Sequence, residues 1–327
     1  MQRYNYGNMN DTSVASLNAA RKPAARAPVH RSKLLRREAI DGFVFIGPWL
    51  LGFILWTAGP MIFSLVLIFM HWSVLAVPSF AGLANISELV HDRLFYIALG
   101  NTAYFTFLAV PLQQLVSLII AFALNLKLRA INVFRTIYYM PTIIPQVASI
   151  MLWMWIFNPE FGLANALLSS LGLPKLGWLW DPHWSKNAIV VMSLWGFGSG
   201  MIIYLAGLQG VPEELYEAAE LDGAGAFQRL LHVTVPMITP VIFFNTCMGF
   251  IGAFQVFSTA YIVSNGAGGP ANSTLFLVLY LYRKGFRYLE MGYAATLAWV
   301  LFIIVLIITM VQFRFARRWV YYEEEVF

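Results

Sequence analysis

The segment ELYEAAELDGAGAFQRLLHVTVP, residues 214–236, differs sharply in composition from the chain on either side of it. It is rich in acidic residues and alanine, and two glycines interrupt it near its middle. The apolar stretch 188–208 precedes it, and the apolar stretch 235–263 overlaps its end and follows it. The sequence therefore predicts a short folded polar loop between two segments of membrane-spanning length.

The overall composition is that of a membrane protein. Apolar residues make up 59% of the 327 residues, charged residues only 11%, and the mean hydropathy is +0.68. A soluble domain is nearer half apolar and a quarter charged. The single cysteine, Cys247, lies within an apolar run, so no internal disulfide can form, and we interpret it as a buried thiol.

Six stretches are long and apolar enough to cross a bilayer, which needs about 20 apolar residues per helix. They cover 43–70, 97–126, 137–157, 188–208, 235–263 and 294–313. Several contain or adjoin a proline, namely Pro48, Pro60, Pro111, Pro141, Pro145 and Pro240. Because neighbouring helices can satisfy the backbone groups that proline frees, we expect an all-α integral membrane protein with six transmembrane helices, some of them kinked.

Lys and Arg are distributed unevenly between the two sides of these spans. With a cytoplasmic N-terminus, 15 of the 21 basic residues lie on the cytoplasmic side. The positive-inside rule then places both termini and segment 214–236 in the cytoplasm. The net charge of +5 follows from this bias and does not argue for a nucleic-acid partner.

The chain divides into a basic N-terminal tail over 1–40, a six-helix transmembrane domain over 41–318 with a cytoplasmic loop over 210–234, and a C-terminal tail over 319–327. The first tail has no short apolar stretch followed by a small-residue cleavage site, so it does not match a signal peptide. We interpret it as a flexible cytoplasmic tail near anionic lipid. A short amphipathic helix over 32–40 is the alternative.

The six spans contain no Asp, Glu, Lys or Arg, the usual parts of proton relays. A self-contained secondary carrier for a small polar solute, for example one coupled to sodium through carbonyl oxygens, stays the alternative to an ATP-driven system. The histidines lie outside the spans or at their ends, no HExxH motif occurs, and GFGSG at 196–200 does not match GxSxG. We therefore expect no catalytic residues, no metal site and no enzyme activity. The chain also lacks GxxxxGK[ST], so any ATP would bind to another subunit.

The loop itself favours a short helix. Pro212 suits a first helical turn, Glu213 and Glu214 complement the positive end of the helix dipole, and Gly223 ends the helix. A second helix is expected over 227–233, leading into the next span. The first helix carries acidic residues beside a small apolar face, and this surface suits docking into a groove on another protein. A helix lying on the membrane is disfavoured, because such helices are usually rich in Lys and Arg.

The loop resembles the cytoplasmic signature of the permease subunits of binding-protein-dependent ABC importers, which is EAA, three residues, Gly, nine residues and I-x-L-P. Here EAA is 217–219, the glycine is Gly223, and VTVP at 233–236 has Val in place of Ile and Leu. The resemblance implies a type I importer permease fold whose loop is the coupling helix docking into an ATPase subunit. It implies ATPase-coupling roles for Glu217, Ala218, Ala219, Asp222 and Gly223.

The resemblance extends over about 41–322 to the carbohydrate-uptake branch, in which GGGP follows the fifth core helix and GAGGP at 266–270 is the counterpart here. The ending RRWVYYEEE is similar to that of permeases for oligosaccharides from plant or algal polysaccharides, an acidic oligosaccharide such as alginate being one candidate. The resemblance implies a sugar importer of the inner membrane that works by alternating access. It also implies a second permease, two ATPase subunits carrying ATP and Mg, and an extracytoplasmic sugar-binding protein, with no cofactor in this chain.

The family binds sugar midway across the membrane, against the spans before and after the coupling helix. By this resemblance the expected substrate-pathway residues are Trp195, Phe197, Asn245, Gly249, Phe250, Ala253 and Gln255. Aromatic rings offer flat faces to sugar C–H groups, and the amides offer hydrogen bonds. Small residues are also the ordinary packing solution between helices in lipid, so packing or lipid contact stays the alternative for these positions.

The outer loops contain the expected binding-protein contacts, which are Gly268, Gly269, Pro270, Arg283 and Lys284. The glycines and the proline are typical of a tight turn. The basic residues lie on the outer side, against the positive-inside trend, and would bind acidic groups of a binding protein or of a uronate sugar. A plain turn and solvated loop charges are the alternatives.

Overall fold

The computed structural model describes residues 33–126 and 129–321 of the chain. It separates into two compact units, Met1–Met61 and Ile62–Phe327. Residues 1–32 of the tail predicted over 1–40, and the last residues, 322–327, lie outside the described residues, while 33–40 are helical, as in the alternative of a short helix over 32–40. The predicted boundary at residue 40 stays a prediction.

The described part of the first unit is helical from its start. Helix α2 (Lys33–Phe53) passes Pro48 without a break and is followed by a π-helical turn, Ile54–Ala58. In that turn the N–H of Gly59 donates to the carbonyl of Ile54, five residues back. This looser turn directly precedes α3 (Gly59–Leu67). The second residue of α3 is Pro60, which lacks the backbone N–H that other residues donate.

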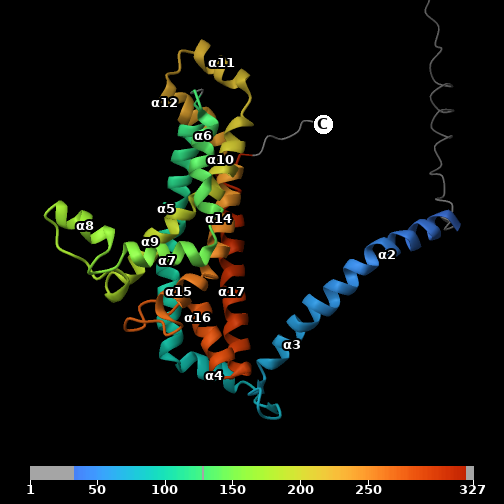
Figure 1. Cartoon of the computed structure of the whole chain (residues 1–327). Coiled ribbons are helices and arrows are strands. Elements are labelled where there is room, and N and C mark those ends of the chain that lie inside the picture. Colours follow the sequence, from blue (N-terminus) through green and yellow to red (C-terminus); the bar gives the residue numbers. More distant parts are fainter. Residues whose placement is uncertain (1–32, 127–128, 322–327) are drawn as a thin grey trace, which may run out of the picture. The chain divides into compact units, whose positions relative to one another are not determined.

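Long apolar helices make up the second unit. Its membrane-length helical stretches are α5 (Arg93–Leu124), α9 (Ser185–Leu194) with α10 (Gly198–Gln209), α14 (Thr239–Phe254) with α15 (Ser258–Ser264), and α17 (Met291–Ala316). Helices α5 and α17 run along the length of the bundle, and α10 and α14 pack against α5 over part of it (Figure 1). With the stretch 36–67, five helical stretches among the described residues are long and apolar enough to cross a membrane.

The expected span 137–157 is not one kinked helix. It consists of α6 (Ile131–Tyr139), a 3-10 turn and α7 (Gln146–Ile156), and the two helical parts are bent by 90°. Pro141 and Pro145 lie in the connection and lack the backbone N–H groups that would continue a helical ladder. Counted as one broken span, the pair brings the number of spans to six.

The expected helix 227–233 lies within a longer helical run, and the expected span 235–263 corresponds to the membrane-length stretch Thr239–Ser264. The chain forms α12 (Ala226–Arg229), a π-helical turn and α13 (Val235–Met237) before α14 begins at Thr239. At its other end α14 stops at Phe254, and three non-helical residues separate it from α15. Both prolines of this region, Pro236 and Pro240, lie in the first two positions of a helix, where a missing N–H costs nothing.

Short elements close the two ends of the bundle. One end has α11 (Glu213–Leu221) and α12. The opposite end has α4 (Ala84–His91), α16 (Leu277–Tyr282) and a small antiparallel pair, β1 (Met70–His71) with β2 (Ser79–Phe80), in which Met70 pairs with Phe80. Helix α8 (Leu163–Ser170) lies in the connection between α7 and α9. Figure 1 shows α11 and α12 at one end, and α4 and α16 at the other.

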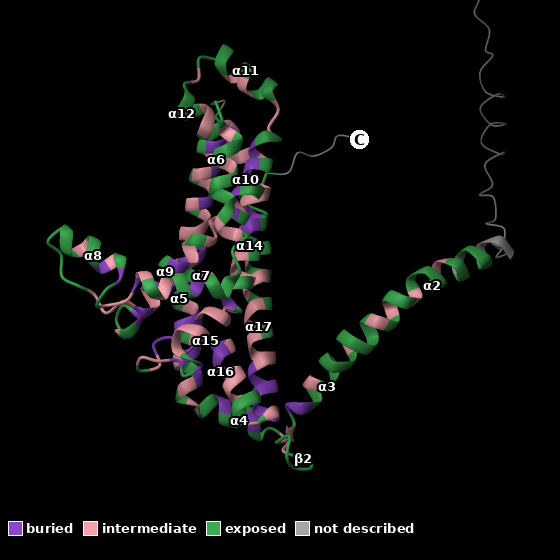
Figure 2. Ribbon diagram, in the orientation of Figure 1, coloured by how far each residue is buried: buried purple, intermediate pink, exposed green. Residues whose placement is uncertain are grey.

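The core lies along α5. In one cluster Phe105 of α5 packs against Phe276, with ring centroids 5.4 Å apart, among fully buried Ile189, Leu279 and Leu297. A second cluster around Met201, Tyr204 and Ile238 joins α5 to α10 nearer the α11 end. Buried residues therefore follow the inside of the bundle, while much of its outer surface is exposed and apolar (Figure 2). That surface suits contact with lipid.

Candidate functional site

The cytoplasmic loop ends its first helix through backbone geometry that depends on glycine. Gly223 has φ +78°, a conformation that side-chain-bearing residues rarely adopt. Its N–H donates to the carbonyl of Glu220 (3.0 Å), and the N–H of Ala224 donates to that of Ala219 (2.9 Å). These two bonds form a Schellman motif, which satisfies the last carbonyls of α11 and turns the chain.

The predicted coupling residues lie together on this loop. Glu217, Ala218 and Asp222 are exposed, and Ala219 is half-buried beside a hollow of about 290 Å³ that Gly223 also lines. No residue of α11 is buried. The loop therefore presents an acidic, small-residue surface that the rest of the described chain leaves uncovered.

Two apolar side chains on this loop escaped the sequence reasoning. Leu221 is 89% exposed and Phe227 is 71% exposed, beside the acidic surface. Their exposure adds apolar side chains to the acidic, small-residue surface of the loop. Their presence in a polar loop was a usable signal in the sequence.

Side-chain contacts brace the loop against the start of the next span. The hydroxyls of Tyr216 and Thr234 lie 3.0 Å apart, and Thr234 is buried. Arg229 forms an ion pair with Glu220 across the turn at Gly223. The loop is thus tied at two places to the segment that leads into α14.

A central cavity of about 550 Å³ lies between α5, α7, α9, α14 and α15. Its polar side chains are Gln113, Gln146, Ser149, Ser193, Gln255, Ser258 and Thr259. Its aromatic side chains are Phe105, Trp153, Trp195 and Phe257. None of the described residues lining it is charged.

Four of the seven expected pathway residues line this cavity: Trp195, Gly249, Ala253 and Gln255. A Cβ on Gly249 would lie 3.0 Å from Gln114 Nε2 and 3.0 Å from Val110 Cγ1, so this glycine also lets α14 approach α5 closely. At this position the pathway and packing interpretations are therefore compatible.

The other three expected residues are not among the cavity-lining residues. Asn245 is 6% exposed, and its backbone carbonyl accepts a hydrogen bond from Gln114 (2.9 Å). The ring of Phe197 packs edge-on against Tyr138, and that of Phe250 packs edge-on against Phe107. Their roles in transport stay predictions.

The cavity combines two kinds of surface. Aromatic rings such as that of Trp195 offer flat apolar faces, while amides and hydroxyls both donate and accept hydrogen bonds. A ligand with apolar C–H faces and many hydroxyl groups satisfies both. The arrangement therefore suits the binding and passage of such a ligand.

The expected contacts at the outer end are held by the chain itself. Gly268 is buried at φ +77°, and a Cβ there would lie 2.9 Å from Leu275. Arg283 donates to the carbonyl of Ala267 (2.9 Å) and to the hydroxyl of Tyr288 (3.0 Å). Gly268 therefore supports the turn rather than offering a surface, while Gly269 and Pro270 are half-buried.

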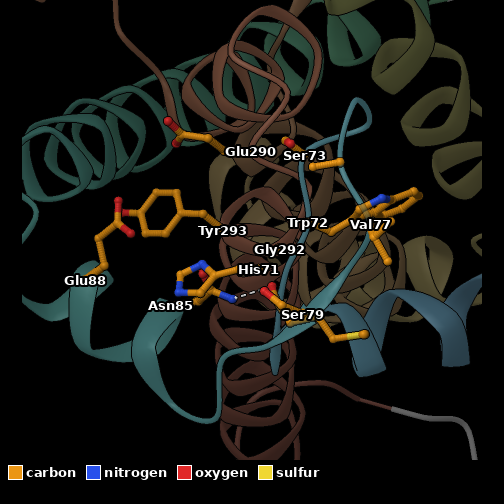
Figure 3. Close-up of a pocket in the computed structure, with 12 residues that line it drawn as sticks. His71, Trp72, Ser73, Val77, Ser79, Asn85, Glu88, Glu290, Gly292 and Tyr293 are labelled. Carbon is orange, nitrogen blue, oxygen red and sulfur yellow. Dashed lines mark hydrogen bonds between the residues drawn. The ribbon is translucent and has the colours of Figure 1, made fainter.

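Lys284 lies between two carboxylates. Its ammonium is 2.6 Å from Glu290 and 3.7 Å from Glu88, it lies 4.7 Å from the ring centre of Tyr293, and its side chain is only 16% exposed. Figure 3 shows Glu88, Glu290 and Tyr293 along one side of an adjoining pocket of about 380 Å³, with Trp72 across from them. The charge of Lys284 is thus already compensated within the chain.

Asp92 joins three elements at the outer end. Its side chain accepts a hydrogen bond from the N–H of Leu94 (2.8 Å), capping α5, and bonds from the hydroxyls of Tyr280 and Tyr293. Burial alone would raise the pKa of Asp92, but these hydrogen bonds outweigh it and hold the pKa below the ordinary value of 3.8. Sequence reasoning missed this contact, because nothing in the sequence pairs Asp92 with residues about 190 positions away.

Most of the second unit matches a known protein family. The family described as "Binding-protein-dependent transport system inner membrane component" matches residues 113–321. The match includes the cytoplasmic loop, the cavity segments from Gln113 onward and the outer turn.

Curated relatives match almost the whole chain. The probable ABC transporter permease protein YesP of Bacillus subtilis is 39% identical over 298 residues, covering 90% of this chain and 96% of that protein. The lactose transport system permease protein LacF of Rhizobium radiobacter is 36% identical, covering 89% of this chain and 99% of that protein. The arabinooligosaccharides transport system permease protein AraP of Bacillus subtilis is 34% identical, covering 83% of this chain and 87% of that protein.

A solved structure shows the same fold. A chain of the bacterial alginate ABC transporter, crystallised with a periplasmic protein bound to an alginate pentasaccharide, superimposes with a TM-score of 0.76. The match covers 88% of this chain and 98% of that chain, at 21% identity. The expected type I importer permease fold is therefore confirmed.

Proposed function

This chain belongs to the family of binding-protein-dependent transport system inner membrane components, and we propose that it forms the pore of an ATP-driven importer of sugars or oligosaccharides. As a member of that family it is a non-enzymatic permease subunit of the inner membrane. The observation that carries the sugar assignment is the uncharged cavity of about 550 Å³, which combines aromatic, amide and hydroxyl side chains. Relatives named for lactose and arabinooligosaccharides support the same substrate class.

Four partners complete the importer in this proposal. A second, homologous permease supplies the other half of the pathway, and two cytoplasmic ATPase subunits bind ATP and Mg. An extracytoplasmic sugar-binding protein delivers the substrate. The family description names binding-protein dependence, which supports the last of these.

The cytoplasmic loop couples ATP to the pathway. Glu217 and Asp222 make polar contacts with the ATPase, and Ala218 and Ala219 allow close approach because they carry little bulk. Gly223 sets the turn that holds α11 in this position. The exposure of Glu217, Ala218 and Asp222 and the fixed end of α11 support the assignment.

Transport proceeds by alternating access. ATP binding closes the two ATPase subunits, and α11 passes that movement through the braced loop to α14, which lines the cavity. The cavity then opens outward to a loaded binding protein, and hydrolysis returns it to the inward-open state. Trp195 stacks on sugar faces and Gln255 bonds hydroxyl groups during passage. The binding protein contacts the outer turn at Gly269 and Pro270, beside Arg283.

Uptake by proteoliposomes that contain the complete complex tests the pathway. Gln255→Ala should lower ATP-dependent uptake of a labelled oligosaccharide about fivefold, because it removes a hydrogen-bonding group worth about 1 kcal/mol. Gln209→Ala is the matched control, since Gln209 is exposed at the end of α10 and does not line the cavity.

The outcomes separate the proposal from its competitor. Uptake that needs ATP and falls only with the cavity variant supports it. Sugar uptake without ATP would instead identify a self-contained carrier. Equal uptake by Gln255→Ala and wild type, together with unchanged uptake by Trp195→Ala, would remove the cavity from the pathway.

A further inference from the structure

One lysine at the outer end differs from the others in its surroundings. Lys186 lies in the first turn of α9, three residues before Ile189 and seven before Ser193, both of which line the cavity. Positions with this spacing share one face of a helix. On α5, Asn101 lies four residues before Phe105, another lining residue. Lys186 and Asn101 thus continue two cavity-lining faces one turn further outward.

Contacts with α5 hold the Lys186 side chain in place. Its ammonium donates to Asn101 Oδ1 (3.2 Å) and lies 5.1 Å from the ring centre of Tyr104. Asn101 is fixed in turn, because its amide N–H groups donate to the carbonyls of Asn272 (2.8 Å) and Leu275 (3.0 Å). The cation is therefore positioned before any ligand arrives, which lowers the entropy lost on binding.

No carboxylate in the described part of the chain compensates this charge. The ion pairs of the described residues involve Lys284, Arg229 and His183, and none includes Lys186. Lys186 is nevertheless half-buried. An ammonium has three N–H donors, and only one of those of Lys186 has a hydrogen-bond acceptor within the described chain.

The basic residues that sequence reasoning selected behave in the opposite way. Lys284 is compensated by Glu290 and Glu88, and Arg283 donates to Ala267 and Tyr288. Both are engaged in holding the outer end together. Lys186 is the half-buried lysine among the described residues that continues a cavity face and has no acidic partner.

We propose that Lys186 selects for an anionic group on the transported sugar, the carboxylate of a uronic acid, at the outer mouth of the cavity. This inference rests on the proposed sugar-importer function. The carboxylate would accept charge-assisted hydrogen bonds from the free N–H donors of Lys186, while the rest of the sugar meets the uncharged cavity wall. The sugar carboxylate is then paired with the Lys186 ammonium as it leaves water, so neither charge is buried without a partner.

Matched acidic and neutral probes test this selection. Proteoliposomes containing the complete complex and its binding protein are supplied with a labelled uronic acid trisaccharide or with its carboxyl-reduced, neutral form. In Lys186→Gln the ratio of acidic to neutral uptake should fall about tenfold, the size expected for one lost charge-assisted hydrogen bond. Lys186→Arg, which keeps the charge, should retain most of the ratio. Because every variant uses the same binding protein, that protein's own preference for acidic or neutral sugar cancels when the uptake ratios of the variants are compared.

Control variants distinguish selection from a structural role. Lys175→Gln removes an exposed lysine from the same side of the protein and should leave the ratio at the wild-type value. A fall of both uptakes by the same factor in Lys186→Gln would make Lys186 only a structural residue and overturn the inference. An unchanged ratio would overturn it too.

Uptake by the wild-type complex distinguishes failure of this inference from failure of the proposed importer function. Uptake of the neutral trisaccharide alone would leave the sugar importer standing and contradict the role of Lys186. ATP-dependent uptake of neither trisaccharide nor of any neutral oligosaccharide tested beside them would contradict the proposed function, and the inference would fail with it.

Discussion

The two ends of the bundle use their polar side chains differently. At the outer end, Asp92 and Lys284 bind groups of the same chain, so their charges hold α4, α5 and the start of α17 together. At the cytoplasmic end, α11 buries no residue, and Glu217 and Ala218 are exposed. The outer end is largely complete in itself, whereas the cytoplasmic end offers a surface for another protein.

This difference predicts two kinds of mutant. Substitutions among the outer contacts should lower stability and leave coupling to ATP intact. Substitutions in the cytoplasmic loop should weaken coupling and leave the folded bundle intact.

Gly223→Pro should have the largest effect, which is loss of the ATPase from the purified complex. Proline fixes φ near −65°, whereas Gly223 needs φ +78°, and proline also lacks the N–H that donates to Glu220. Affinity purification of the tagged chain measures the bound ATPase. Gly225→Ala is the matched control, because Gly225 has φ −70° and a Cβ there meets only a Gln228 oxygen at 3.8 Å. A Gly223→Pro complex with full ATPase content would break the comparison.

Asp92→Asn should lower the free energy of unfolding by about 2 kcal/mol, because hydrogen bonds to a charged acceptor are replaced by weaker ones. The apparent melting temperature in detergent measures the change. Asp181→Asn, at a half-buried residue whose partner His183 is exposed, should move it little. Retained thermal stability together with lost coupling to the ATPase would reverse the roles assigned to the two ends.

The contribution of Asp92 should also depend on pH. Its pKa in the folded protein lies below the ordinary 3.8, so its stabilisation is fully present above pH 3.8 and is lost as the pH falls below that value. The difference in melting temperature between wild type and Asp92→Asn should therefore be constant near neutral pH and shrink toward pH 3. A difference that grows on acidification would contradict this account of the site.

Tyr216→Phe should weaken coupling by a smaller amount. The variant removes the hydrogen bond to Thr234, worth about 1 kcal/mol, and should lower sugar transported per ATP hydrolysed about fivefold without releasing the ATPase. Thr234→Val removes the other partner of the same contact. The double variant should be no worse than either single one, and fully additive losses would show that the two residues act separately.

Lys284→Gln should have the smallest effect on transport. Its ammonium already pairs with Glu290 and Glu88, so its loss should leave the ratio of acidic to neutral sugar uptake unchanged. Because the loss leaves these two half-exposed carboxylates without their partner, it should cost about 1–2 kcal/mol of stability. The comparison with Lys186→Gln is direct, since both lysines lie at the outer end. A change of selectivity in Lys284→Gln alone would move the recognition site to the outer network.

The sequence was sufficient for six spans, with the bent pair α6 and α7 counted as one, and for the helix and turn of the cytoplasmic loop, whose coupling role stays a prediction. Spans are readable because each must be apolar over about 20 residues, whatever its neighbours are. The loop is readable because its helix, its left-handed Gly223 and its exposed surface all depend on residues close together in the chain. The 90° bend near Pro145 was not readable, since proline is tolerated inside spans such as α2 and α5.

The cavity and the outer contacts were only partly predictable, because they depend on pairs distant in sequence. Gln113 and Ser149 line the cavity from the spans 97–126 and 137–157, whereas pathway residues were expected only in the two spans that flank the cytoplasmic loop. Trp195 and Gln255 could be selected because they lie in the two spans that flank the coupling loop. Lys186 and Lys284 look alike in the sequence, and only their neighbours in the fold distinguish them.

The most direct test of the central claim is purification of the tagged chain in mild detergent, with the ATPase content and ATP hydrolysis of the complex measured for wild type and Ala218→Glu. Ala218 is exposed on α11, so the larger charged side chain should leave the bundle folded and block docking. The account predicts that wild type copurifies with an active ATPase and that Ala218→Glu loses it. A wild-type chain that purifies alone and moves sugar into vesicles without ATP would contradict it.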